Sequence, residues 1–261
     1  MFILSLFQTI PSLLLEVIIF LLIIFFYLFG HNIRAAVLKK KPGYINKQLT
    51  AINGTLLGLL GLLLAFTFSM ASNRYDARRQ LIVEEANNIS TVILRTDIYP
   101  DSIAQLLKKE LKVYVDARID FYKAGNDQEE TIKFFLEADS VGKKIWTVAA
   151  SFAKENNAVA KTSELIPAIN AMIDITTTRR EAGEANIPDS IMYLLLTLCY
   201  CSAFLLGYDN AEKVDWVIVT GFALMLSITI FTIIDLDRPR SGLINLDNTN
   251  RLMIELQHMF K

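Results

Sequence analysis

Four long runs of apolar residues constrain this chain more than any other feature. They cover residues 11–29, 51–71, 191–208 and 214–234. Each run is close to the roughly 20 apolar residues that an α-helix needs to cross about 30 Å of hydrocarbon. The chain of 261 residues is 53% hydrophobic and 20% charged, and most of its charges lie between or after these runs. We therefore predict an integral membrane protein with four spanning helices.

The spans form two hairpins separated by a long, charged region. We expect a first hairpin in residues 1–72, a soluble domain in 73–188, a second hairpin in 189–235 and a C-terminal tail in 236–261. The first run has neither a basic segment before it nor a small-x-small cleavage site after it, so we expect it to be retained as a span.

Apolar residues of the middle region recur at helical spacing, and strand-like alternation is nearly absent. The predicted class is therefore an all-α membrane protein, with a helical domain inserted between the second and third spans. Neither Gly nor Pro occurs between Ser72 and Tyr99, so the second span should continue into that domain as one helix that ends near Pro100.

A stripe of small residues follows one face of the second span at steps of three and four. It consists of Gly54, Gly58, Gly61, Ala65 and Ser69. Small residues let helix backbones approach closely in lipid, so the stripe indicates either tight packing against another helix or a place beside a pore. The two interpretations are compatible if an adjacent apolar face looks into a channel as a constriction.

That adjacent face carries Leu62, Phe66 and Met70, one helical turn apart. The polar segment Asn73, Arg74, Tyr75, Asp76 and Arg78 follows where the helix leaves the membrane. Arg74 and Tyr75 are typical of residues that anchor a helix at the membrane–water interface. Charged residues near the end of a span otherwise indicate a binding site, because charge within the membrane is costly unless it is paired or hydrated. Glu84 and Glu85 follow one or two turns later, where they either pair with Arg78 and Arg79 or form a solvated face.

Several of these segments resemble the bestrophin family. Residues 56–66 and 73–78, followed by Pro100, are similar to the bestrophin pore helix and its continuation outside the membrane. Residues 180–181 resemble the stretch before the third bestrophin span, and residues 237–242 the turn after the last one. The match is best to a bacterial, bestrophin-like branch.

The resemblance implies a pentameric channel for small ions, with a central pore lined by the second span. It also implies a multi-pass protein of the bacterial inner membrane, whose middle domain and termini are cytoplasmic. Positive charge alone does not fix this orientation, because six basic residues near the spans lie on one side and eight on the other. In the family the neck is three apolar rings, which Leu62, Phe66 and Met70 fit; a one-residue shift would nominate Leu63, Thr67 and Ala71.

The chain departs from animal bestrophins at the end of the fourth span. Asp235 and Asp237 are interrupted by Arg238 and Arg240, which does not reproduce the family's acidic calcium clasp. We therefore expect no bound metal or cofactor.

No enzyme motif is present, and a net charge of −1 gives no bias toward nucleic acid. The predicted partners are lipid, further copies of the chain and small inorganic ions. A non-conducting scaffold or sensor, whose helical domain binds a partner, is the alternative function.

Overall fold

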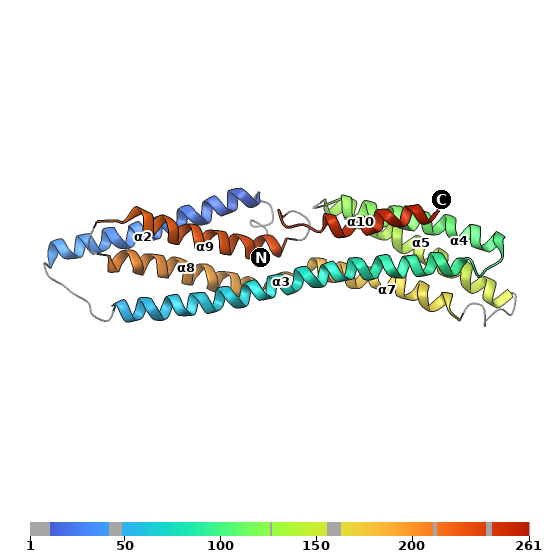
Figure 1. Cartoon of the computed structure of the whole chain (residues 1–261), viewed down its shortest axis with the longest axis horizontal. Coiled ribbons are helices and arrows are strands. Elements are labelled where there is room, and N and C mark those ends of the chain that lie inside the picture. Colours follow the sequence, from blue (N-terminus) through green and yellow to red (C-terminus); the bar gives the residue numbers. More distant parts are fainter. Residues whose placement is uncertain are drawn as a thin grey trace. The chain divides into compact units, whose positions relative to one another are not determined.

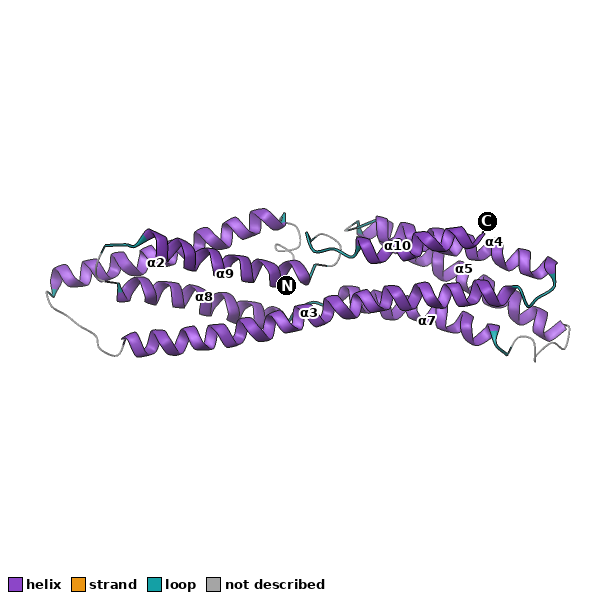
Figure 2. Ribbon diagram, viewed as in Figure 1, coloured by secondary structure: helices purple, strands orange, loops and turns teal. Residues whose placement is uncertain are grey.

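The computed structural model describes residues 11–41, 49–125, 127–155, 163–210, 213–238 and 242–260. Within these ranges the regular structure is helical and contains no strand (Figure 2), which confirms the predicted all-α class. Four long apolar stretches suited to a membrane span lie in α2 (Ser12–Lys40), α3 (Leu49–Thr96), α8 (Asp189–Asp209) and α9 (Trp216–Leu236). Two of the basic residues that we counted to judge the orientation of the spans, Lys47 and Arg240, lie outside the described residues.

The chain divides into two compact units. The first contains Met1–Arg74 and Asn186–Arg238, and the second contains Tyr75–Ala185 and Pro239–Lys261. Helix α3 is a single helix of 48 residues, with its first part in one unit and its last part in the other (Figure 1). The prediction of one continuous helix is confirmed, and the helix ends four residues before Pro100.

In the first unit α2 packs against α8 and α9. Two glycines permit a close crossing of α2 and α8: a Cβ atom on Gly207 would lie 1.9 Å from the Tyr27 carbonyl oxygen, and one on Gly30 would lie 2.0 Å from the Phe204 carbonyl oxygen. No larger residue fits at either position without moving the backbones apart. Helix α3 is tied to α8 by Asn53, whose Nδ2 donates to Asp209 Oδ2 at 3.1 Å.

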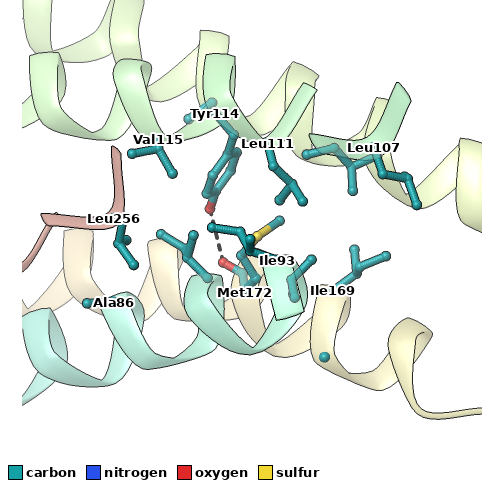
Figure 3. Close-up of a cluster of buried hydrophobic side chains, with 14 of the residues drawn as sticks. Ala86, Ile93, Leu107, Leu111, Tyr114, Val115, Ile169, Met172 and Leu256 are labelled. Carbon is teal, nitrogen blue, oxygen red and sulfur yellow. Dashed lines mark hydrogen bonds between the residues drawn. The ribbon is translucent and has the colours of Figure 1, made fainter. Parts of the chain in front are cut away.

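The second unit is a bundle around the last part of α3. Its other helices are α4 (Asp101–Lys123), α5 (Gln128–Glu155), α7 (Leu165–Glu184), α10 (Asp247–Glu255) and the 3₁₀ helix η1 (Leu256–Phe260). Figure 3 shows its apolar core, where Ile93, Leu111 and Ile169 from three different helices converge. Tyr114 is buried there and donates its hydroxyl hydrogen to the Met172 carbonyl oxygen at 3.1 Å.

The C-terminal segment is part of this second core. Leu246, Met253 and Leu256 are buried with the apolar residues of the bundle. On the outside, Gln257 Nε2 donates to Asp116 Oδ1 at 2.7 Å. The C-terminal tail therefore packs onto the helical domain through its apolar residues.

Candidate functional site

Helix α3 uses only one side to pack within the first unit. Leu60, Thr67 and Ala71 are at most 2% exposed. They follow one another at spacings of seven and four residues, which keeps them on one face of a helix with 3.6 residues per turn. Thr67 satisfies its hydroxyl by donating to the Leu63 carbonyl oxygen at 2.8 Å. The opposite face of the helix packs against none of the other described residues in this unit.

The small residues lie on that open face. Each of the five predicted positions, Gly54, Gly58, Gly61, Ala65 and Ser69, is exposed. A Cβ atom built on any of the three glycines would meet no heavy atom within 4 Å. This is the reverse of Gly30 and Gly207, so the part of the chain that the structure describes does not require small residues at these positions for packing.

The predicted neck residues also lie toward the open side. Leu62 is 53% exposed and Phe66 is 61% exposed, whereas Met70 is half-buried. The alternative register is different: Thr67 and Ala71 are fully buried, and Leu63 is half-buried. Within the described residues, the first register therefore has two exposed large apolar side chains, Leu62 and Phe66, whereas the second has none.

The predicted exit residues separate into two groups. Asn73 and Asp76 are exposed, and Arg74 is half-buried. Tyr75 donates its hydroxyl hydrogen to the Asn245 carbonyl oxygen at 3.3 Å, and Arg78 is only 4% exposed. Both of these last residues lie within the second unit and bind its backbone.

Arg78 binds the C-terminal end of α7. Its Nε donates to the Ala182 carbonyl oxygen at 2.9 Å, and its Nη2 donates to the Ala185 carbonyl oxygen at 2.6 Å. The last carbonyl groups of a helix lack partners within the helix and carry a partial negative charge. Arg78 is thus placed to stabilise this helix end.

A buried ion cluster lies next to this contact in the same unit. Glu85 accepts from Arg118 through both carboxylate oxygens, and from Arg179 Nη1 at 2.5 Å. Arg179 Nη2 continues to Asn250 Oδ1 at 2.8 Å, which links α7 to α10. Glu85 and Arg118 are fully buried. Glu85 therefore pairs with two distant arginines and not with its sequence neighbours Arg78 and Arg79.

The cluster keeps Glu85 ionised. Burial by itself would raise the pKa of this carboxyl group, but the charges and hydrogen bonds of Arg118 and Arg179 lower it to about 2. The same pairing with Glu85 raises the pKa of Arg118, against the opposing effect of burial. No local sequence pattern indicates the cluster, since Arg118 and Arg179 lie 33 and 94 residues from Glu85.

The acidic residues at the end of α9 are buried and do not form an open acidic site. Asp235 and Asp237 are buried, together with Arg238. Asp237 Oδ2 accepts from the Ile187 backbone N–H at 2.8 Å, which joins the end of α9 to the start of α8. Among the described residues, no group of three or more His, Cys, Asp or Glu side chains is arranged to hold a metal ion.

Comparison with known proteins gives one consistent result. The model of the bestrophin-like domain matches residues 11–250. A bacterial bestrophin homologue from Klebsiella pneumoniae has a similar structure, with a TM-score of 0.70 and 13% identity over 94% of this chain and 98% of that chain. A point mutant of that homologue gives a TM-score of 0.73 and 11% identity over 94% and 95% of the two chains.

No match was found among curated proteins. The structural likeness, at such low identity, shows the fold alone. The family model covers most of the chain, from the first span to the C-terminal helix. The chain belongs to the bestrophin-like family.

Proposed function

We propose that this chain forms a homo-oligomeric, pentameric ion channel whose pore is lined by α3. The observation that carries the proposal is the open face of α3, where glycines and large apolar side chains lie exposed along a membrane-spanning segment. Because lipid tails are as apolar as leucine, association of such helices depends on close packing, which small residues allow. The bestrophin-like family supplies the expectation of copies arranged around one axis.

Leu62, Phe66 and Met70 form the neck of this channel. Rings of apolar side chains can gate a pore by excluding water from a narrow segment. The exposure of Leu62 and Phe66, and the burial of Thr67 and Ala71, support this register over its neighbour. Gly54, Gly58, Gly61, Ala65 and Ser69, beside the neck, allow neighbouring subunits to approach.

Asn73, Arg74, Tyr75 and Asp76 form the exit from the neck, where side chains of both signs meet the permeating ion. Arg78, in contrast, supports the exit by holding α3 against the end of α7. In this arrangement the helical domain is cytoplasmic, the protein resides in a bacterial inner membrane, and small ions pass from the neck toward that domain.

The test is conductance of the purified protein in planar bilayers. We expect single-channel currents, and we expect Phe66→Ala to raise the conductance or open probability because it removes a large ring from the constriction. Phe25→Ala is the matched control, since Phe25 is a similarly exposed phenylalanine (58%) of a predicted span, on α2, and is not part of the proposed neck. Its currents should equal those of the wild type.

Two results would count against the channel. Silence of the wild type across potassium, sodium and chloride gradients would favour a scaffold that binds a partner. Equal effects of Phe66→Ala and Phe25→Ala would remove Phe66 from the pore. Reversal potentials in asymmetric salt, measured on the same bilayers, determine the ion preference.

A further inference from the structure

The last turns of α2 extend past the end of the helix that packs beside it. Helices α2 and α8 run in the same direction: the rings of Phe26 and Tyr200 lie 5.0 Å apart, and further along, the guanidinium carbon of Arg34 lies 5.5 Å from the centre of the Tyr208 ring. Helix α8 ends one residue after Tyr208. Helix α2 continues for six residues after Arg34, to Lys40, which is about 9 Å of helix. The end of α2 therefore projects beyond the end of α8.

This projecting end carries three consecutive lysines, Lys39, Lys40 and Lys41, and all three are exposed. Lys213 is a fourth exposed lysine, in the short connection between α8 and α9. Among the described residues, the ammonium groups of these four lysines have neither an ion-pair partner nor a hydrogen-bond partner. Their positive charges are therefore available to a partner with negative charge.

The described carboxylates at the same end are already engaged within the chain. Asp209 Oδ2 accepts a hydrogen bond from Asn53 Nδ2 at 3.1 Å. Asp215 caps α9, because its Oδ1 accepts from the backbone N–H groups of Val217 at 3.0 Å and Ile218 at 3.2 Å. The described part of this end thus presents four exposed positive charges and two carboxylates that have donors of their own. Its surface is positively charged, although the chain as a whole has a formal net charge of −1.

An exposed tryptophan indicates where the membrane surface lies at this end. Trp216 is the first residue of α9 and is 56% exposed, and the two apolar residues after it are more exposed still. Tryptophan is enriched where the hydrocarbon of a bilayer meets the headgroups. Lys213 precedes Trp216 by three residues, and the lysines of α2 lie beyond the end of α8. We therefore expect these lysines at the level of the headgroups.

The arrangement of the lysines decides which kind of anion they suit. Neighbouring positions of a helix point about 100° apart, so Lys39 and Lys40 point in different directions, and Lys41 follows where the helix ends. Side chains that diverge in this way are poorly placed to converge on one small anion. They are well placed to contact several separate anionic groups in a layer.

We propose that the end of α2, together with Lys213, is a binding surface for the phosphate headgroups of anionic phospholipids of the phosphatidylglycerol class. Basic residues beside a span attract anionic lipids, and each one near the membrane surface adds to the attraction. The surface belongs to each subunit and can face either side of the membrane. It exists whether or not the protein conducts ions.

The experiment counts bound lipids by native mass spectrometry of the full chain in detergent. Dioleoyl phosphatidylglycerol or dioleoyl phosphatidylcholine is added at the same concentration. The wild type should retain phosphatidylglycerol over phosphatidylcholine by about fivefold or more. The triple variant Lys39→Gln, Lys40→Gln, Lys41→Gln should lose most of this preference, because it removes the charges and keeps side chains of similar length.

The matched control makes the same change of charge at three exposed lysines of the second unit. It is the triple variant Lys109→Gln, Lys112→Gln, Lys154→Gln. This control should bind the two lipids as the wild type does, because its substitutions lie in the helical domain and not at the end of a span.

Four outcomes overturn the proposal. The first is a wild type that retains both lipids equally, and the second is a preference that the α2 triple variant keeps in full. The third is an equal loss in the control variant, since this would be an effect of net charge alone. The fourth is a preference that inorganic phosphate at the concentration of the lipid abolishes, because the lysines would then bind free phosphate and not a lipid surface.

Discussion

Replacing Glu85 by glutamine should destabilise the helical domain more than almost any other single substitution that preserves shape. Glutamine keeps an acceptor for Arg118 but removes the one negative charge that the two arginines share. Breaking a buried ion pair by removing one partner costs about 3–5 kcal/mol, because the remaining charge stays buried.

The pKa of Glu85 gives a second route to the same magnitude. It falls from an ordinary value of 4.5 to about 2 in the folded chain. Since a tenfold change in an equilibrium constant corresponds to about 1.4 kcal/mol, a lowering of this size corresponds to roughly 3 kcal/mol of native-state stability at neutral pH. A lowered carboxyl pKa stabilises the fold above pH 4.5, and this stabilisation is lost as the pH falls from there toward 2.

The assay is guanidinium unfolding of the detergent-solubilised protein, followed by Trp146 fluorescence in a Trp216→Phe background. Trp146 lies in α5 of the second unit, so it reports on the domain that contains the cluster. Glu85→Gln should lower the free energy of unfolding by about 3 kcal/mol at pH 7. Glu84→Gln, at the exposed neighbouring position, should change it by less than about 0.5 kcal/mol.

The pH dependence separates this explanation from a simple packing defect. The difference between the wild type and Glu85→Gln should shrink as the pH is lowered below about 4.5, because the Glu85 carboxyl group of the unfolded chain then binds a proton, whereas that of the folded chain does so only near pH 2. A difference under about 1 kcal/mol at pH 7, or one that is unchanged at pH 3, would refute the assignment of Glu85 as the counter-charge of the cluster.

Two further substitutions test the packing inside each of the two units, one in the first and one in the second. Gly207→Ala should destabilise the first unit by about 1–3 kcal/mol or more, because the added methyl group would lie 1.9 Å from the Tyr27 carbonyl oxygen. The control Gly221→Ala has space for the methyl group and should be neutral or stabilising. Thermal unfolding in detergent measures both effects. Tyr114→Phe removes a buried hydrogen bond to the Met172 carbonyl oxygen and should cost about 1 kcal/mol in the Trp146 assay, and an unchanged stability would show that this bond contributes nothing net.

The fold could be predicted from the sequence because the patterns that indicate it most strongly lie within single helices. Apolar runs of membrane-spanning length predict spans, and the absence of Gly and Pro from Ser72 to Tyr99 predicts the continuity of α3. Each of these inferences needs only the residues within one helix. They required no knowledge of which helix packs on which.

Features that depend on contacts between distant segments could not be predicted from the sequence in this way. Glu85 stands beside Glu84 in the sequence with nothing to mark it as buried, and its partners are in α4 and α7. Gly30 and Gly207 enforce a close crossing, whereas Gly54 and Gly58 leave space, yet all four are glycines in apolar helices. Only the packing of the helices tells such residues apart.

The most direct test of the central claim is block of the conductance by a thiol reagent at a single cysteine on the open face of α3. In a Cys201→Ser background, which removes the exposed native thiol, Leu62→Cys should conduct and should lose its current when a charged methanethiosulfonate reagent is added. Val217→Cys, at a position 84% exposed on α9, should conduct without block. Currents that persist after complete modification of Cys at position 62 would contradict a pore lined by this face.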